Sequence, residues 1–80
     1  MRVVIEEDTF LEDKGKLRYS PEQLDEILRS VIERIAKKPE ELLSLGAGFG
    51  MVKIDSDPPL YIWFAFDAEC VRLHLIKEGE

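Results

Sequence analysis

The side chains best suited to acid–base or nucleophilic chemistry are the single histidine, His74, and the single cysteine, Cys70. An imidazole exchanges protons near neutral pH, and a thiolate is a strong nucleophile. On an extended strand, residues four positions apart are separated by about 13 Å, too far for a Cys–His pair that must meet within hydrogen-bond distance. No acidic residue is placed beside His74 to orient its ring. We therefore expect no catalytic residue and no enzyme, with Cys70 acting as a small apolar filler.

Three alternating glycines, Gly46, Gly48 and Gly50, offer a second possible chemistry, because exposed backbone N–H groups can bind an anion. A dinucleotide fingerprint needs GxGxxG after a strand and before a helix. Here the spacing is GxGxG and the order of elements is reversed, and no Lys-Ser/Thr pair follows for a phosphate loop. We expect a helix C-cap that runs into a flexible connection, with a weak anion site at these three glycines as the alternative.

Carboxylates are numerous, but their spacing does not predict a metal site. Asp55 and Asp57 flank Ser56 before two prolines, and two carboxylates from one loop are too few for calcium, which takes six to eight oxygens. Asp and Pro are ordinary turn residues. The acidic stretch around residues 6–13 is interpreted as a solvated, edge-protecting segment, with a docking site for a basic partner as the alternative. We expect no metal and no cofactor.

Composition limits the remaining classes of function. The 80 residues carry 17 acidic and 11 basic side chains, a net charge of −6. Nucleic-acid binding relies on clustered basic residues, so nucleic acid is not an expected partner. No stretch approaches the roughly 20 apolar residues of a membrane span, and the N-terminal stretch does not read as a signal peptide. We expect a single cytoplasmic α+β domain over residues 1–80.

The clearest element is a helix that begins at Ser20-Pro21-Glu22-Gln23. Ser20 and Gln23 fit a capping box, and Pro21 fits the first helical position. The apolar positions that follow form one stripe on a 3.6-residue helix: Leu24, Ile27, Leu28, Val31, Ile32 and Ile35. Glu33 and Lys37 form an i,i+4 pair, and Pro39 should end the helix.

The flanking segments give weaker signals. Val3-Val4-Ile5 is typical of a short strand. Residues 9–19 form either a small hairpin, with Gly15 supplying a positive φ, or an irregular acidic loop. Residues 39–45 are expected to be a short second helix that ends before Gly46.

The last third, Phe49 to Lys77, predicts a three-stranded antiparallel meander. A two-residue loop at Asp67-Ala68 would place Phe66, Phe64, Ile62 and Leu60 opposite Glu69, Val71, Leu73 and Leu75. It would also place Trp63 opposite Arg72 and Tyr61 opposite His74. Pairing Ile54 with Leu60 aligns the first two strands. This register sorts the aliphatic side chains onto one face, which the helix stripe should cover.

The opposite face is amphipathic and has aromatic side chains at its centre. Its expected interface residues are Met51, Tyr61, Trp63, Arg72 and His74. Tyr, Trp, Met and Arg are enriched at the cores of protein interfaces, and Trp63 could stack on Arg72. In the alternative interpretation, residues 9–19 or 40–45 of the same chain fold over this face and bury it.

The sequence thus predicts an α+β fold in which one long amphipathic helix packs on a mainly antiparallel sheet of four to six strands. The leading hypothesis is a small acidic protein that works by protein–protein contact, as an inhibitor, an antitoxin- or immunity-like protein or an accessory subunit. Its partner is itself, as a homodimer, or another protein. The alternatives are a small-ligand or anion-binding module, or a minor enzyme, using Gly46–Gly50 and His74, and an acidic mimic of nucleic acid.

Overall fold

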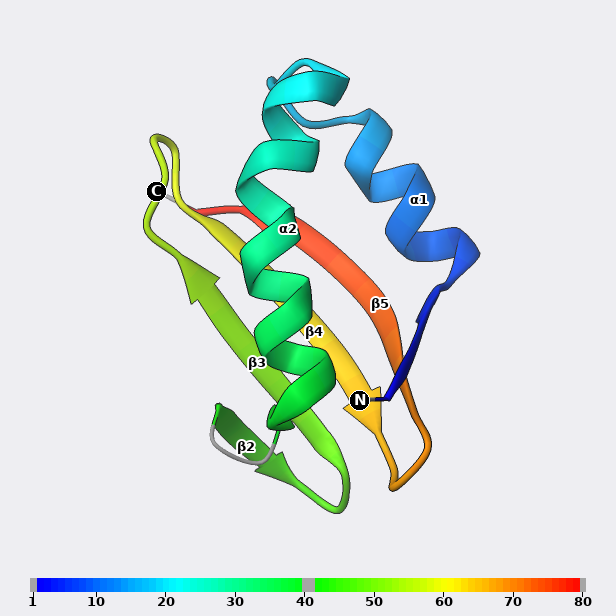
Figure 1. Cartoon of the computed structure of the whole chain (residues 1–80). Helices are drawn as coiled ribbons and strands as arrows, with labels where there is room; N and C mark the ends of the chain where they lie inside the picture. The colour runs from blue at the N-terminus through cyan, green and yellow to red at the C-terminus, as the bar shows by residue number, and fades with distance from the viewer. Residues whose placement is uncertain (1, 40–41, 80) are drawn as a thin grey trace.

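The computed structural model describes residues 2–39 and 42–79, except for the side chains of residues 43–45. The elements in chain order are β1 (Val3–Glu6), α1 (Asp8–Gly15), α2 (Pro21–Lys37), β2 (Leu43–Gly46), β3 (Phe49–Ile54), β4 (Leu60–Phe66) and β5 (Cys70–Glu78). The strands form one sheet in the order β1-β5-β4-β3-β2. Helix α2 crosses one face of this sheet and α1 lies beside β5 (Figure 1). The α+β class and the C-terminal meander β3-β4-β5 are confirmed.

Helix α2 begins and ends as the sequence predicts. The Ser20 side chain accepts a hydrogen bond from the Gln23 N–H at 3.3 Å, and the Gln23 side chain accepts one from the Ser20 N–H at 3.0 Å. Lys37 and Glu33 form their ion pair at 2.8 Å. The helix stops at Lys37, two residues before Pro39, because proline lacks the N–H that would continue the hydrogen-bond pattern.

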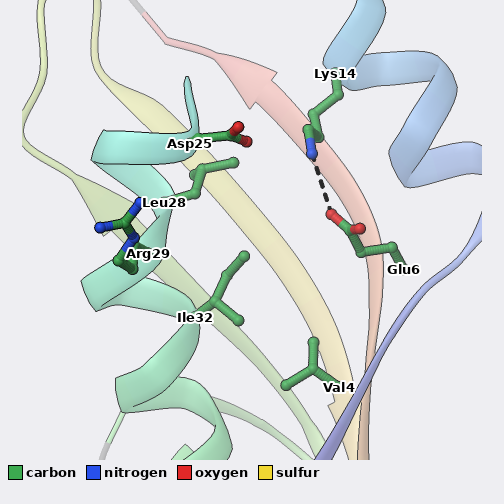
Figure 2. Close-up of a pocket in the computed structure, with 7 residues that line it drawn as sticks. All are labelled: Val4, Glu6, Lys14, Asp25, Leu28, Arg29 and Ile32. Carbon is green, nitrogen blue, oxygen red and sulfur yellow. Dashed lines mark hydrogen bonds and ion pairs between the residues drawn. The ribbon is translucent and has the colours of Figure 1, made fainter. Parts of the chain in front are cut away.

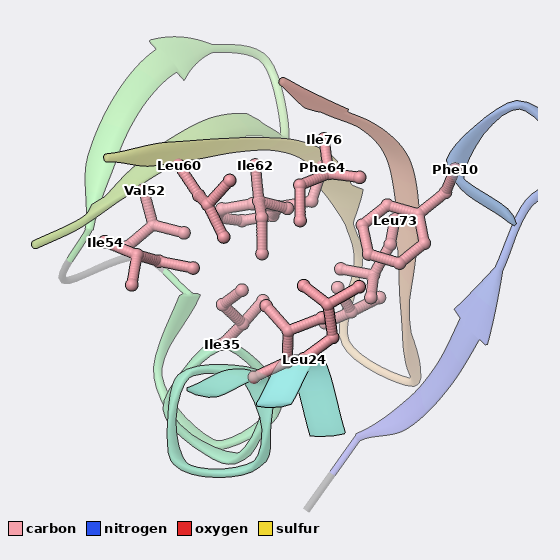
Figure 3. Close-up of a cluster of buried hydrophobic side chains, with 12 residues drawn as sticks. Phe10, Leu24, Ile35, Val52, Ile54, Leu60, Ile62, Phe64, Leu73 and Ile76 are labelled. Atoms are coloured by element: carbon pink, nitrogen blue, oxygen red, sulfur yellow. The ribbon is translucent and has the colours of Figure 1, made fainter. Parts of the chain in front are cut away.

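The hydrophobic core lies between α2 and the sheet face that it covers. Leu24, Leu28 and Ile35 are its buried α2 residues, and Ile27, Val31 and Ile32 pack half-buried around them. Alternate residues of the meander point toward the helix (Figure 3): Val52, Ile54, Leu60, Ile62, Phe64, Val71, Leu73 and Ile76. One aromatic side chain enters this core from outside the helix–sheet pair, Phe10 of α1, which is 0% exposed.

The N-terminal region contains the predicted strand, but a helix replaces the predicted hairpin or loop. Strand β1 pairs parallel with β5, Val3 opposite Cys70 and Ile5 opposite Arg72, so one of the four strand pairs in the mainly antiparallel sheet is parallel. Residues 8–15 form α1 rather than part of a hairpin or a loop. The physical reason is Phe10: on a helix it points into the core while Leu11 and Glu12 stay in solvent. The prediction that the long helix is the only helix in the N-terminal half is therefore wrong, because α1 precedes α2.

Helix α1 also protects the edge of β5 beyond the end of β1. The Thr9 hydroxyl donates to the His74 carbonyl oxygen at 2.7 Å. The Ile76 N–H donates to Asp13 Oδ2 at 3.3 Å, and Lys77 Nζ donates to Asp13 Oδ1 at 2.9 Å. Side chains of α1 thus pair with backbone groups that an open edge strand would expose.

The short helix predicted for residues 39–45 is wrong over the described residues, and residues 40–41 lie outside them. Residues 43–46 form strand β2, antiparallel to β3, with Ser44 opposite Gly50. Ala47 and Gly48 form the two-residue loop between Gly46 and Phe49, with φ angles of 47° and 80°. Positive φ at both loop residues matches the twist of a hairpin. Packing against β3 therefore outweighs the weak local helix signal, and the expected helix C-cap is a hairpin turn.

Gly48 should tolerate no larger residue. Its φ of +80° is unfavourable for an L side chain, and an added Cβ would lie 2.9 Å from the Phe66 carbonyl oxygen. We expect Gly48→Ala to lower the free energy of unfolding by about 1 to 3 kcal/mol, measured by urea denaturation. Gly15→Ala is the control, since nothing lies within 4 Å of a Cβ there and alanine favours a helix. Equal losses for the two variants would contradict this explanation.

The register of the meander is predicted correctly for β3–β4 and incorrectly for β4–β5. Ile54 lies opposite Leu60 and Met51 opposite Trp63, as expected. In β4–β5, however, Phe66 pairs with Val71 and Phe64 with Leu73, and the register shifts again before Trp63 pairs with Leu75.

The shift is a β-bulge in which His74 is the extra residue of β5. A bulge reverses the alternation of the strand that contains it. Beyond His74, Ile76 therefore points into the core and is 1% exposed, whereas Leu75 faces away and is 37% exposed. Leu75, predicted to be a core residue, lies on the opposite face.

Candidate interaction surface

The sheet face turned away from α2 is the candidate site, and we call it the outer face. The strand registers place on it Val3, Ile5, Phe49, Met51, Lys53, Tyr61, Trp63, Ala65, Cys70, Arg72, Leu75 and Lys77, with His74 at the bulge. All five predicted interface residues thus lie on or beside one surface. Phe49 and Leu75 also lie on the outer face, although neither was among the predicted interface residues. Alternation back from Met51 could have identified Phe49, whereas Leu75 reaches this face only because of the bulge.

Neither segment proposed to cover this face from within does so in the described part of the chain. Helix α1 contacts β5, and its buried aromatic side chain belongs to the core on the other side of the sheet. Strand β2 lies beside β3 and extends the sheet. Phe49 is 51% exposed at the end of β3. The outer face is therefore open to solvent over its described residues.

The centre of the outer face is a row of uncharged side chains, Met51, Trp63 and Leu75, on adjacent strands. Tyr61 and Trp63 lie along β4 with ring centroids 6.1 Å apart and ring planes tilted by 32°. Beside Trp63 is a hollow of about 310 Å³, lined by Phe49, Gly50, Trp63, Phe64, His74 and Leu75. An apolar hollow next to a half-exposed tryptophan is typical of the central region of a protein interface.

The cations of the outer face lie around this centre, and each has an acidic partner in the chain. Lys53 Nζ lies 4.0 Å from Asp55, Lys77 Nζ lies 2.9 Å from Asp13, and Arg72 contacts Glu7 at 3.1 Å. The hydrogen bond that Arg72 donates to the Glu7 carboxylate, together with nearby negative charge, raises the pKa of Arg72 above its usual value. The predicted stacking of Trp63 on Arg72 does not form, because Arg72 lies opposite Ala65.

His74 and Cys70 do not form a catalytic pair. His74 lies beside Trp63 and Leu75 at the hollow, and among the described residues no carboxylate bonds to its imidazole. Cys70 Sγ lies 3.7 Å from Asp67 Oδ2. The backbone N–H groups of Cys70 and Glu69 donate to Asp67 and hold the pKa of that carboxyl below its usual value. Asp67 therefore stabilises the β4–β5 turn.

The three glycines proposed as a weak anion site do not share one loop. Gly46 precedes the hairpin turn and Gly48 lies within it, whereas Gly50 is buried within β3, opposite Ser44 and Phe64. Its position in the sheet separates it from the turn. Across the described residues, no group of three His, Cys, Asp or Glu side chains is arranged to hold a metal ion.

A second concave region, which sequence reasoning missed, lies between β1 and α2. This groove has a volume of about 500 Å³. Val4 and Ile32 point toward each other across it, and Lys14 pairs with Glu6 at 3.2 Å on its far wall (Figure 2). Asp25, Leu28 and Arg29 complete the lining. Only the tertiary packing of α1, β1 and α2 brings these residues together.

Comparison with known proteins assigns the chain to no class. No protein-family model matches it, and no curated protein is similar to it in sequence. Within the described part of the chain, neither helix is long and apolar enough to cross a membrane.

Proposed function

We propose that this protein works through protein–protein contact, and that the outer face centred on Trp63 is its working surface. The observation that carries the proposal is the uncovered, uncharged centre formed by Met51, Trp63 and Leu75, with an apolar hollow beside it. Large contiguous apolar patches are uncommon on the surfaces of monomeric proteins and often mark interaction sites.

The residue types support the same proposal. Trp, Tyr and Arg account for most binding hot spots, which lie near the centre of an interface within a rim that excludes water. Here Trp63 lies at the centre, Tyr61 lies next to it along β4, and Arg72 lies at the rim, where Glu7 neutralises it. Binding would therefore bury the aromatic rings without leaving an unpaired charge. An inhibitor, an antitoxin- or immunity-like protein and an accessory subunit all fit such a surface.

The alternative, a small-ligand or anion site that uses His74 and Gly46–Gly50, has less support. Gly50 is held within the sheet, and His74 lies in an apolar hollow.

Replacing Trp63 by alanine tests the proposal. We expect the variant to stay folded, because Trp63 points away from the core, and to bind its partner at least about 30-fold more weakly, as loss of a hot spot implies. The measurements are thermal melting, sedimentation for self-association, and affinity capture from the source cell followed by titration of the captured protein. Leu11→Ala is the control, since Leu11 is 47% exposed on α1. A folded Trp63→Ala protein with unchanged self-association and unchanged partner binding would refute the proposal.

A further inference from the structure

We infer that the groove between β1 and α2 binds an extended, basic segment of another protein, which adds to β1 as a further strand. None of the residues that line the groove belongs to the outer face, so this is a second surface beyond the proposed function. Three features of the groove carry the inference: an open backbone edge, an apolar floor, and a carboxylate without a cationic partner.

The open edge of β1 faces α2. The Glu7 N–H donates to the Leu73 carbonyl oxygen of β5 at 3.1 Å, so the odd-numbered residues of this segment bond to β5. Even-numbered residues direct their backbone groups to the opposite edge. Arg2 shows what lies on that side, because its N–H donates to the Ala36 carbonyl oxygen of α2 at 3.3 Å.

Beyond Arg2 this edge has no partner strand. In the described part of the chain β1 pairs with β5 alone, so the backbone N–H and C=O groups of Val4 and Glu6 are directed at the groove. An extended segment lying antiparallel to β1 would exchange two hydrogen bonds with each of these residues. The edge therefore matches the backbone of an added strand.

The floor of the groove is apolar. Leu28 is buried, whereas Val4 and Ile32 are half-buried and point toward each other (Figure 2). The volume of about 500 Å³ lies within the usual range of ligand sites. An apolar side chain of the added segment, placed opposite Val4, would cover Val4 and Ile32.

The charges of the groove favour a basic segment. Glu6 neutralises Lys14 at 3.2 Å. The Asp25 carboxylate extends from α2 toward β1, whereas the Arg29 guanidinium points away from β1 (Figure 2). Among the described residues, no cation pairs with Asp25. A lysine or arginine opposite Glu6 would lie in the same groove as this carboxylate, and the net charge of −6 attracts such a segment.

The direction of the added strand sets the order of its residues. Antiparallel pairing, the more stable kind, places a basic residue opposite Glu6, then one intervening residue, then an apolar residue opposite Val4. Strand β1 has only four residues, so the contact is short and weak. We expect a Kd of about 10 to 500 µM.

The labelled peptide Ser-Lys-Thr-Ile-Thr-Ser, titrated with the full chain and followed by fluorescence anisotropy, tests the inference. We expect saturable binding in that range. An ester in place of the isoleucine amide removes the N–H that would bond to Val4, without added bulk, and should weaken binding about 3- to 10-fold. An ester at the preceding threonine is the matched control, because that N–H would point away from β1. Absence of binding, or equal losses for the two esters, would overturn the inference.

A charge exchange tests the role of Asp25. Asp25→Lys should weaken binding of the peptide by about 3- to 10-fold, and the peptide with glutamate in place of lysine should bind this variant more tightly than it binds the natural chain. Glu26→Lys is the matched control, since Glu26 is exposed on the same helix but does not line the groove. Far-ultraviolet circular dichroism checks that both variants are folded. Equal losses for the two variants would show that the groove does not select a basic segment.

Other occupants give different results. If the NMR shifts of Val4 and Ile32 change with protein concentration in the absence of peptide, a second copy fills the groove and the choice of occupant is overturned. Trp63→Ala should leave peptide binding within about twofold, because Trp63 lies on the outer face. Loss of peptide binding in a folded Trp63→Ala protein would place the peptide on the outer face and overturn the inference.

Discussion

Phe10→Ala should lower the free energy of unfolding by about 3 to 5 kcal/mol, the largest effect expected for a single substitution in α1. The ring is 0% exposed and packs within the core formed by α2 and the sheet. It is also the one residue of α1 that belongs to that core cluster. A domain of 80 residues has a free energy of unfolding of roughly 4 to 12 kcal/mol, so this loss is a large part of the total.

The expected outcome is a protein that is unfolded, or nearly so, at physiological temperature. Urea denaturation followed by tryptophan fluorescence gives the free energy of unfolding, since Trp63 is the only tryptophan. Leu11→Ala is the control: its side chain is the next in the same helix, is 47% exposed and should change stability by less than about 0.5 kcal/mol. A loss below about 1 kcal/mol for Phe10→Ala would show that α1 is not anchored as described.

Asp13→Ala should be the second most damaging change, with a loss of about 1 to 3 kcal/mol. Asp13 is 7% exposed and accepts hydrogen bonds from the Ile76 N–H and from Lys77 Nζ. Alanine would leave that backbone N–H without a partner in a buried position. It would also remove the hydrogen bonds that hold this part of α1 against the edge of β5. Asp13→Asn, which keeps an acceptor oxygen, should lose less, and urea denaturation compares the two variants.

The contribution of Asp13 should depend on pH. The hydrogen bond from Lys77 is the main reason that the pKa of Asp13 lies below its usual value; burial opposes this shift, and the Ile76 N–H adds to it. A carboxyl whose pKa is lower in the folded than in the unfolded protein contributes stability above its unfolded pKa of about 4 and loses it as the pH falls through the folded value.

The difference in stability between the natural chain and Asp13→Ala should therefore be constant near neutral pH and shrink below about pH 4. Melting temperatures across the acid range measure it. Glu33→Ala is the control, because its pair with Lys37 is exposed to solvent and should matter much less. A difference that stays constant into strong acid would show that the charge of Asp13 plays no part.

Where local signals agreed with the tertiary fold, the sequence was sufficient to predict the structure. Ser20, Pro21 and Gln23 define the start of α2 within one turn of chain, and the stripe from Leu24 to Ile35 has the helical period. The pairing of Ile54 with Leu60 follows from the sorting of aliphatic side chains across a short loop. In these places the local preference and the demand for burial agree.

Where packing competes with local preference, the sequence was insufficient. Residues 8–15 carry no strong helix cap, and α1 forms because Phe10 must reach a core built by elements far along the chain. Strand β2 replaces a predicted helix because β3 offers it backbone partners. The candidate surface shows the same division: its residue types and alternation identify Trp63, Tyr61 and Met51 from sequence alone.

The edges of that surface could be identified only from the tertiary structure. A bulge changes alternation without a local signature, so nothing near His74 indicates that Leu75 turns outward and Ile76 inward. The neutralisation of Arg72 by Glu7 and of Lys77 by Asp13 depends on α1 lying along β5, across more than 60 positions of sequence. The sequence by itself therefore determined that Met51, Tyr61 and Trp63 share one face of the sheet, because alternation is a local property of a strand. The tertiary structure decided how far that surface extends and how its charges are arranged, because both depend on contacts between segments distant in the chain.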